Sequence, residues 1–336
     1  MMYIFFMKLI CAPMATLSHP AFRFLIEKFA GCDEYFTEMI NAPSLINAGP
    51  FEKFYVETVP VPEKLVFQLT GKNAESMAIA SEILCEKECK GIDLNMGCSA
   101  PEIERSGAGI SWMLKPLEET ENLVRLVKKS IENSGKDIRL SAKIRLGSEN
   151  FTDESFFSFC DMLVSSGVQA ITVHPRTKKE KYRDKPKYIY VQKLCERFKN
   201  ENIEIFANGD VKDFSSYKEV LKICPSVSGV MIGRALVQKP WLCSLLKRTE
   251  SEENPSIEID FLSLALDFID DVKRFQPPEF YKTRLQRFFS YFCDNFSFAH
   301  YARTSLLNAK SIEETCQRLY EYFEKVPEDR IKRVGL

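Results

Sequence analysis

Eight short apolar segments alternate with amphipathic helical segments over the first 250 residues, and this alternation restricts the possible folds. The expected strands are residues 9–12, 35–38, 65–69, 91–95, 140–144, 170–174, 204–207 and 229–232. They are rich in Val and Ile and largely apolar, which is typical of parallel strands buried on both faces. Eight such strands match a (β/α)8 barrel, or TIM barrel, in number and size. A doubly wound open sheet is the alternative.

Helical patterns lie between most of these strands, and they continue after the last one. Within the expected barrel they cover residues 74–88, 117–132, 153–166, 213–223 and 236–246. The polar segment 248–256 marks a boundary, after which four amphipathic segments follow without a strand pattern: residues 261–275, 281–293, 298–308 and 311–325. Ser311 and Glu314 have the spacing of a capping box. We therefore expect a catalytic barrel over residues 1–250 and a small helical bundle domain over residues 256–336.

Composition restricts the compartment and the partners. The 11 cysteines are an odd number without a disulfide-like spacing, which favours reduced thiols and a cytoplasmic location. The apolar N-terminus lacks a basic segment, is interrupted by Lys8 and is too short to span a bilayer, so its second half is expected to be the first strand. No other segment is long and apolar enough to cross a membrane. With only three His and no zinc-like spacing, no metal site is expected.

Polar or reactive side chains lie at or just after the end of every expected strand. They are Met14, Glu38, Gln68, Asn95 with Cys98, Lys143 with Arg145, His174 with Arg176, Asn208 with Asp210, and Arg234. The carboxyl ends of barrel strands form one rim, and active sites are built on that rim. Each residue alone could be a structural cap, but such residues at all eight strand ends indicate an active site.

The segment 93–98 is the most informative part of this rim. An apolar strand ends there in a polar turn that presents the thiol of Cys98, and Gly97 is expected to allow the turn. Residues 106–109 are expected to form a second flexible loop nearby. Most cysteines are inert core residues. The position of Cys98 instead suggests a nucleophile or a general acid, and the absence of a His close in sequence favours the acid.

The last two strand ends suggest a phosphate site. Glycine in the segments 208–210 and 233–234 would let a phosphate approach backbone N–H groups, and Arg234 would add charge. Lys143 ends an apolar strand, so its ammonium must meet an anion. That anion is either a carboxylate or the reduced ring of a flavin, which carries negative charge. Gln68 could bond the edge of such a ring, or it could be an amide that bonds the neighbouring backbone.

Two basic segments contrast with the formal net charge of −1. Residues 176–187 contain seven Lys or Arg and two Asp or Glu, and residues 273–310 contain the same numbers, so each carries a charge of +5. Aromatic residues are interleaved in the second segment. Such runs usually form a solvated face, and helical aromatics usually form a core. Two basic segments beside one rim nevertheless suggest a bound polyanion.

These motifs together resemble those of the tRNA-dihydrouridine synthases. In the order and spacing of that family, the chain has Ala12-Pro13-Met14, Thr37-Glu38-Met39, Gln68-Leu69, Asn95-Met96-Gly97-Cys98 with Gly107-Ala108-Gly109, Lys143-Ile144-Arg145, Val173-His174 with Arg176-Thr177, Asn208-Gly209-Asp210 and Gly233-Arg234. The resemblance covers the whole expected barrel, and the segment that ends in Cys98 is its most specific part. The helical tail is similar in position and size.

The resemblance implies an enzyme that uses FMN to reduce the C5–C6 bond of uridines in tRNA, with NADPH or NADH as the reductant. It implies that hydride passes from flavin N5 to C6 of the uracil and that Cys98 protonates C5 as the general acid. The residues implied to line the flavin are Pro13, Met14, Ala15, Gln68 and Lys143. Those implied to hold its phosphate are His174, Asn208, Gly209, Asp210, Gly233 and Arg234. Those expected at the substrate are Asn95, Arg145 and Arg176.

The chain departs from the family pattern at two positions. Ser99 follows the cysteine where the family usually has Pro, and Pro175 follows the histidine where it usually has Gly. Both changes affect loop stiffness and remove no reacting group. Two other functions stay open, namely a flavin barrel that acts on a small pyrimidine, like a dihydroorotate dehydrogenase, and a tRNA-binding protein without catalysis. The expected partner is tRNA, and the expected state is a monomer.

Overall fold

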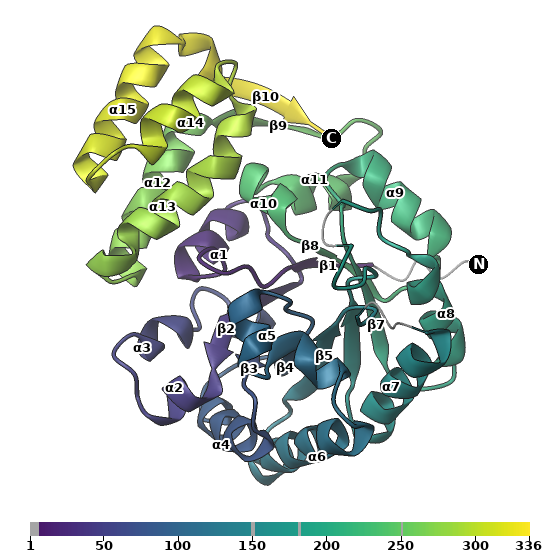
Figure 1. Cartoon of the computed structure of the whole chain (residues 1–336). Helices are drawn as coiled ribbons and strands as arrows, with labels where there is room; N and C mark the ends of the chain where they lie inside the picture. The colour runs from purple at the N-terminus through teal and green to yellow at the C-terminus, as the bar shows by residue number, and fades with distance from the viewer. Residues whose placement is uncertain (1–6, 149–151, 181–182, 250) are drawn as a thin grey trace.

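The computed structural model describes residues 7–148, 152–180, 183–249 and 251–336. Its centre is a closed barrel of eight parallel strands in the order β1 to β8, with β8 paired to β1 (Figure 1). The strands are β1 (Lys8–Cys11), β2 (Glu34–Asn41), β3 (Leu65–Thr70), β4 (Gly91–Met96), β5 (Arg139–Ile144), β6 (Ala170–Val173), β7 (Glu204–Asn208) and β8 (Gly229–Ile232). The barrel predicted from the sequence is confirmed, and the open sheet is excluded.

The helices that precede residue 250 form an outer ring around the barrel, apart from α5, which lies in front of the strands in the view of Figure 1. They are α1 (Pro20–Glu27), α2 (Ala42–Ile46), α3 (Glu52–Tyr55), α4 (Ala74–Cys85), α5 (Pro101–Arg105), α6 (Leu117–Asn133), α7 (Asp153–Ser165), α8 (Ile189–Arg197), α9 (Phe214–Ile223), α10 (Arg234–Gln238) and α11 (Leu242–Arg248). Short 3-10 turns are η1 (Pro62–Lys64), η2 (Gly109–Met113), η3 (Cys293–Asn295) and η4 (Pro327–Asp329). The single helix expected over residues 236–246 is wrong. It is divided between α10 and α11, because Pro240 lacks an N–H and excludes the helical conformation at Lys239.

Four helices follow the barrel, as the sequence predicts, and two strands accompany them. The helices are α12 (Phe261–Phe275), α13 (Pro278–Phe292), α14 (Ala299–Leu307) and α15 (Ile312–Lys325). The strands β9 (Ser256–Asp260) and β10 (Ile331–Gly335) pair as an antiparallel ribbon, so the expectation of a region without strands is wrong. The side chain of Ser311 caps α15 by accepting from the N–H of Glu314, but the Glu314 carboxylate accepts from the N–H of Lys310 instead of completing a capping box.

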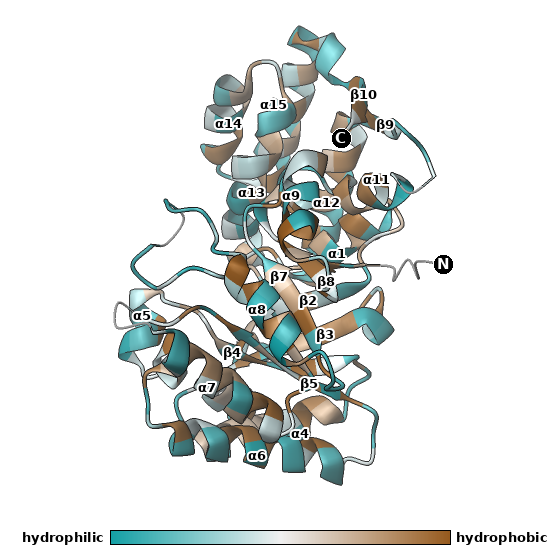
Figure 2. Ribbon diagram, turned by 90° about the vertical axis from the view of Figure 1, so that its right-hand side faces the viewer, coloured by the Kyte–Doolittle hydropathy of each residue, from teal (hydrophilic) through white to brown (hydrophobic). Residues whose placement is uncertain are grey.

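Apolar side chains fill both the space between the barrel and its helices and the inside of the barrel. Figure 2 shows hydrophobic strands at the centre and hydrophilic outer faces on the helices. The interior cluster consists of Ile10, Ala12, Phe36, Val66, Ala170, Phe206 and Met231. Apolar side chains therefore fill much of the barrel interior, next to a few buried polar side chains such as Asp93, Gln68 and Ser141.

The end of the barrel where its strands begin is closed by ion pairs. Glu34, which is fully buried, pairs with Arg139 at 2.5 Å and with Lys8 at 3.3 Å. Glu204 pairs with Arg139 at 2.7 Å and also with Lys8. Because these four side chains come from β1, β2, β5 and β7, they join opposite sides of the barrel. The cluster leaves the other end as the open one.

The C-terminal helices pack against α1 and the rim of the barrel. Phe24 stacks on Phe275 with ring centroids 5.1 Å apart. Arg284 of α13 is buried and pairs with the buried Glu38 of β2 at 2.8 Å. One of the seven cations in the basic segment 273–310 is thus an interface residue rather than part of a solvated face. Among the described residues, no helix combines the length and the apolar character needed to cross a bilayer.

Candidate active site

Cys98 lies on the loop that follows β4, at the open end of the barrel. Its side chain is half-buried, whereas eight of the other cysteines are buried. The side-chain oxygen of Asn95 accepts from the N–H groups of Cys98 at 3.0 Å and Gly97 at 3.3 Å. On the other side of the loop, the N–H of Ile110 donates to the carbonyl of Cys98 at 2.9 Å. These bonds fix the loop on both sides, so the thiol has a defined position on the rim.

Two glycines are required by close contacts of this loop. A Cβ on Gly97 would be 3.2 Å from the backbone of Ile144 in β5, so this glycine permits contact between the loop and the strand rather than a left-handed turn. Gly109 has φ +60°, and a Cβ there would be 2.5 Å from the carbonyl oxygen of Cys98. The segment expected to be a flexible loop therefore supports Cys98 directly.

Polar side chains from neighbouring strands form a buried network beneath Cys98. Gln68 of β3 is fully buried, and its oxygen accepts from the side chain of Asn95 at 2.9 Å. Its nitrogen donates to Asp93 at 2.8 Å. Asp93 is not among the site residues predicted from the sequence. A charged residue in an apolar strand, two positions before a polar strand end, is the signal that could have revealed it.

Lys143 lies beside Asn95, since the two are register partners on β5 and β4. Its side chain is half-buried, and within the described residues its ammonium has no hydrogen-bond or ion-pair partner. Burial, with a contribution from the charge of Arg145, lowers the pKa of Lys143 to about 8, while Asp93 acts in the opposite direction. A partly buried ammonium without a partner is costly, and an anion bound at the rim would offset this cost.

Four cations surround His174 at the ends of β5, β6 and β8. Burial, together with the charges of Lys143, Arg145, Arg176 and Arg234, lowers the pKa of His174 to about 2. The guanidinium of Arg176 lies 3.0 Å from Nε2 of His174. Because a guanidinium can only donate, Nε2 is the acceptor and the ring proton is on Nδ1. The imidazole is therefore neutral and lies in a positively charged part of the rim.

The segment after β7 supplies a carboxylate to this region. Asp210 has a left-handed φ of +46° and pairs with Arg176, and at 3.3 Å with Arg234. Gly209 has φ +137°, and a Cβ there would be 2.9 Å from Pro186. Asn208 donates from its side chain to the carbonyl of Met231 at 2.9 Å, which joins β7 to β8.

The two arginines expected at the substrate lie within the wall of the site. Arg176 is 1% exposed and bonds Asp210 and the carbonyl of Asp184. Arg145 is 8% exposed and donates to the carbonyl of Gly97 at 3.0 Å. Direct contact of either residue with a substrate stays a prediction. Their observed contacts support the rim loops that carry Cys98 and Asp210.

The segment after β1 meets the end of β8. The N–H of Ala12 donates to the carbonyl of Ile232 at 2.9 Å, and the N–H of Met14 donates to the hydroxyl of Ser18 at 2.8 Å. A Cβ on Gly233 would lie 3.5 Å from Ala12 and from the sulfur of Met14, which is ordinary contact. Pro13 and Met14 are half-buried here and Ala15 is exposed. The predicted flavin and phosphate segments are thus neighbours on the rim.

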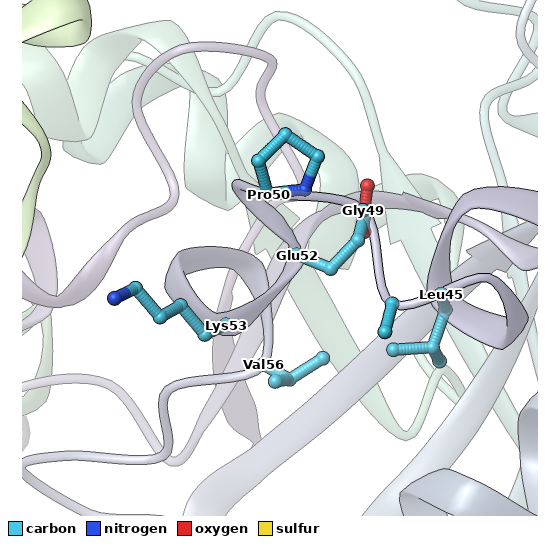
Figure 3. A pocket seen from close by; sticks show the side chains of 7 residues that line it. Leu45, Gly49, Pro50, Glu52, Lys53 and Val56 are labelled. Atoms are coloured by element: carbon cyan, nitrogen blue, oxygen red, sulfur yellow. The ribbon is translucent and has the colours of Figure 1, made fainter.

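A separate pocket lies between α2 and α3, outside the rim (Figure 3). Its volume is about 400 Å³, and it is lined by Leu45, Ala48, Gly49, Pro50, Glu52, Lys53 and Val56. None of the site residues predicted from the sequence contributes to it. Among the described residues, no three His, Cys, Asp or Glu side chains are grouped as metal ligands.

The fold and the rim by themselves define a class of protein. A closed parallel barrel with a thiol, an ammonium and a cluster of cations at the carboxyl ends of its strands is a (β/α)8 enzyme whose site suits an anionic ligand. The chain belongs to the dihydrouridine synthase family, whose model, described as "Dihydrouridine synthase (Dus)", matches residues 10–326. The resemblance found in the sequence is confirmed, and the chain is an enzyme of this family.

Individual relatives agree with the family match. A "Probable tRNA-dihydrouridine synthase" of Aquifex aeolicus is 32% identical over 267 residues, which are 78% of each chain. A "tRNA-dihydrouridine(16) synthase" of Neisseria meningitidis is 29% identical over 265 residues, covering 77% of this chain and 76% of that protein. Among solved structures, morphinone reductase has a TM-score of 0.50 at 11% identity, covering 73% of this chain and 86% of its own. That structural similarity concerns the fold alone.

Proposed function

We propose that this enzyme reduces the C5–C6 bond of uridine in tRNA to give 5,6-dihydrouridine, with FMN as its cofactor, NADPH or NADH as the reductant and Cys98 as the general acid. The observation that carries the proposal is the position of the Cys98 thiol. It is half-buried, on a loop fixed by Asn95, at the same rim as Lys143 and the cations around His174. Relatives with tRNA-dihydrouridine synthase names support the substrate class.

The residues of the rim fit FMN in charge and in placement. The cations around His174 would hold the phosphate, together with backbone N–H groups of the segments 208–210 and 233–234. Lys143 would offset negative charge on the ring, because its ammonium lacks a partner among the described residues. Pro13, Met14, Ala15 and Gln68 would line the ring. The chemistry that bound FMN supplies is hydride donation to C6 of the uracil, after reduction by NADPH or NADH.

The thiol of Cys98 would deliver the proton to C5. A general acid must be held within hydrogen-bonding distance of the atom that it protonates, and the hydrogen bonds that Cys98 donates to Asn95 and accepts from Ile110 hold the loop in place. Asn95 would also orient the uracil edge. A uracil reaches such a site only when it is turned out of its stack, so a surface that grips the RNA is needed as well.

The basic segments are proposed to form that surface. In residues 176–187, Arg183 and Lys185 are exposed, and in the C-terminal helices Lys273, Lys282 and Arg287 are exposed. Lys181 lies outside the described residues. We assign catalysis to residues 1–250 and RNA contacts mainly to residues 256–336, and we propose a cytoplasmic monomer.

The substitution Cys98→Ala tests the proposed role of the thiol. The variant is expected to bind FMN and to accept hydride from NADPH at the wild-type rate, but to form no dihydrouridine in tRNA, as measured by mass spectrometry of digested RNA. Cys316→Ala is the matched control, because Cys316 is also half-buried but lies on α15 of the tail. Full product formation by the Cys98 variant would refute the role of this thiol.

A further inference from the structure

Asp93 is a fully buried carboxylate inside the barrel, beneath the active-site rim. It lies on β4, two residues before Asn95, so both side chains point to the barrel interior. One of its oxygens accepts from the side-chain nitrogen of Gln68 at 2.8 Å, and the other accepts from the hydroxyl of Ser141 at 2.7 Å. A buried carboxylate is costly, and Asp93 touches none of the groups proposed to react.

The charge of Asp93 determines the direction of the hydrogen bonds that lead through Gln68 and Asn95 to Cys98. An ionised carboxylate can only accept, so Gln68 must turn its nitrogen toward Asp93 and its oxygen toward Asn95. Asn95 must then donate to Gln68, which leaves its own oxygen to accept from the N–H of Cys98. In this series of hydrogen bonds, the side-chain amides of Gln68 and Asn95 each have only one possible orientation.

We propose that Asp93 is a positioning residue, which orients Gln68 and Asn95 and thereby holds the loop of Cys98. The same orientation has a consequence for the substrate and rests on the proposed function. One N–H of the Asn95 amide is used by Gln68, and its oxygen is used by Cys98 and Gly97. Asn95 therefore offers its second N–H to the pyrimidine, which recognises a carbonyl of the base and not its N3–H.

Asp93 is ionised at neutral pH, although its surroundings raise its pKa. Burial raises its pKa to about 6, while the bonds from Gln68 and Ser141 and the charges of Lys143 and Arg139 act against this increase. Below that pH a protonated carboxyl can itself donate, and the orientation of Gln68 is no longer fixed. The contribution of Asp93 is thus present above about pH 6 and is lost as the pH falls through this value.

The experiment compares Asp93→Asn with Ser141→Ala. The first keeps the shape but removes the acceptor-only character, and the second removes one bond to the same carboxylate without changing the orientation of Gln68. The first readout is the rate at which iodoacetamide alkylates Cys98 in flavin-free protein, followed on the isolated peptide. We expect Asp93→Asn to increase this rate about three- to tenfold, because a bond that closes the loop is weakened, and Ser141→Ala to leave it within about twofold.

The second readout is product formation in a single turnover of reduced, flavin-loaded enzyme with tRNA. Asp93→Asn is expected to be about ten- to a hundredfold slower, and to lack the fall in rate that the wild type shows below about pH 6. Equal alkylation rates and an unchanged pH profile in Asp93→Asn would overturn the inference.

Gln68→Met keeps the question answerable if Asp93→Asn does not fold. This change cuts the connection between Asp93 and Asn95, so the alkylation rate of Cys98 must rise as it does in Asp93→Asn, and an unchanged rate would overturn the inference. Because alkylation requires neither flavin nor RNA, it is independent of the proposed activity. Wild-type enzyme that alkylates as expected but forms no dihydrouridine would overturn the proposed function, and with it the part of the inference that concerns the base.

Discussion

Replacing Lys143 with Met tests whether the ammonium on the rim is present to bind an anionic cofactor. The side chain is half-buried and has no hydrogen-bond or ion-pair partner among the described residues. Its pKa falls from 10.5 to about 8, mainly through burial. At about 1.36 kcal/mol for a tenfold change, this corresponds to at most roughly 3 kcal/mol of destabilisation, and residual contact with solvent reduces it.

The sign of the effect follows from the two protonation states. Between about pH 8 and 10.5 the unfolded chain holds the Lys143 proton and the folded chain does not, so the stability of the flavin-free protein rises with pH over this range. Lys143→Met removes this rise and is more stable than the wild type near pH 7. The affinity for FMN changes in the opposite direction, because an anion binds only the protonated amine. Near pH 9 only about a tenth of the molecules hold the proton, so affinity is expected to be about tenfold weaker than near pH 7.

The measurement is a fluorescence titration of flavin-free protein with FMN near pH 7, 8 and 9. Lys143→Met is expected to bind FMN more weakly near pH 7 and to show no further loss toward pH 9. Lys143→Arg is the matched control, because a guanidinium stays charged throughout this range and should give an affinity independent of pH. Wild-type affinity that is equal near pH 7 and pH 9, or undiminished affinity in the Met variant, would show that this ammonium does not bind the cofactor.

Three further predictions concern the loop, the tail and the RNA. Gly109→Ala should lower the free energy of unfolding in urea by more than Gly135→Ala does. Gly135 has a similar φ of +66°, but no atom lies within 4 Å of a Cβ placed there. The positive φ alone costs about 1–2 kcal/mol, so equal losses in the two variants would exclude a clash at Gly109. Arg284→Met should cost about 3–5 kcal/mol by leaving Glu38 unpaired, and the added change Glu38→Gln should restore most of it, whereas no recovery would contradict this cause. Arg183→Ala should weaken tRNA binding for all sequences and reduce the slope of log affinity against log salt by about 0.9, while an unchanged slope would remove Arg183 from the RNA surface.

The barrel was predictable because its strands are buried on both faces and therefore stand out as apolar runs. β8 was predicted with its observed ends, and α12 likewise. The ribbon of β9 and β10 was not, because its strands are short, mostly polar and joined across about seventy residues, so neither has an apolar run of its own. The break at Pro240 could have been predicted, since proline and the residue before it resist the helical conformation.

The rim was predictable residue by residue, but its connections were not. Strand ends identified Cys98, Lys143 and His174, because parallel strands bring their carboxyl ends together. The sequence could not show that Arg176 would be buried against Asp210. Nor could it show that Arg284 would be buried in an ion pair with Glu38 of the barrel instead of lying on the basic surface. Such pairings depend on contacts between side chains that are distant in sequence, and a count of charges does not distinguish a buried arginine from an exposed one.

The ion pairs among four side chains close the end of the barrel where its strands begin, so its interior is open only at the other end. These side chains are Lys8, Glu34, Arg139 and Glu204. Under the proposed function, the nicotinamide of the reductant and the everted uracil must both enter through that open end. The oxidised nicotinamide must therefore leave before the uracil can enter. Initial-rate plots against one partner at several concentrations of the other should therefore give parallel lines, and each partner in excess should compete with the other. The closed end of the barrel would in this way determine the order in which the reductant and the tRNA bind.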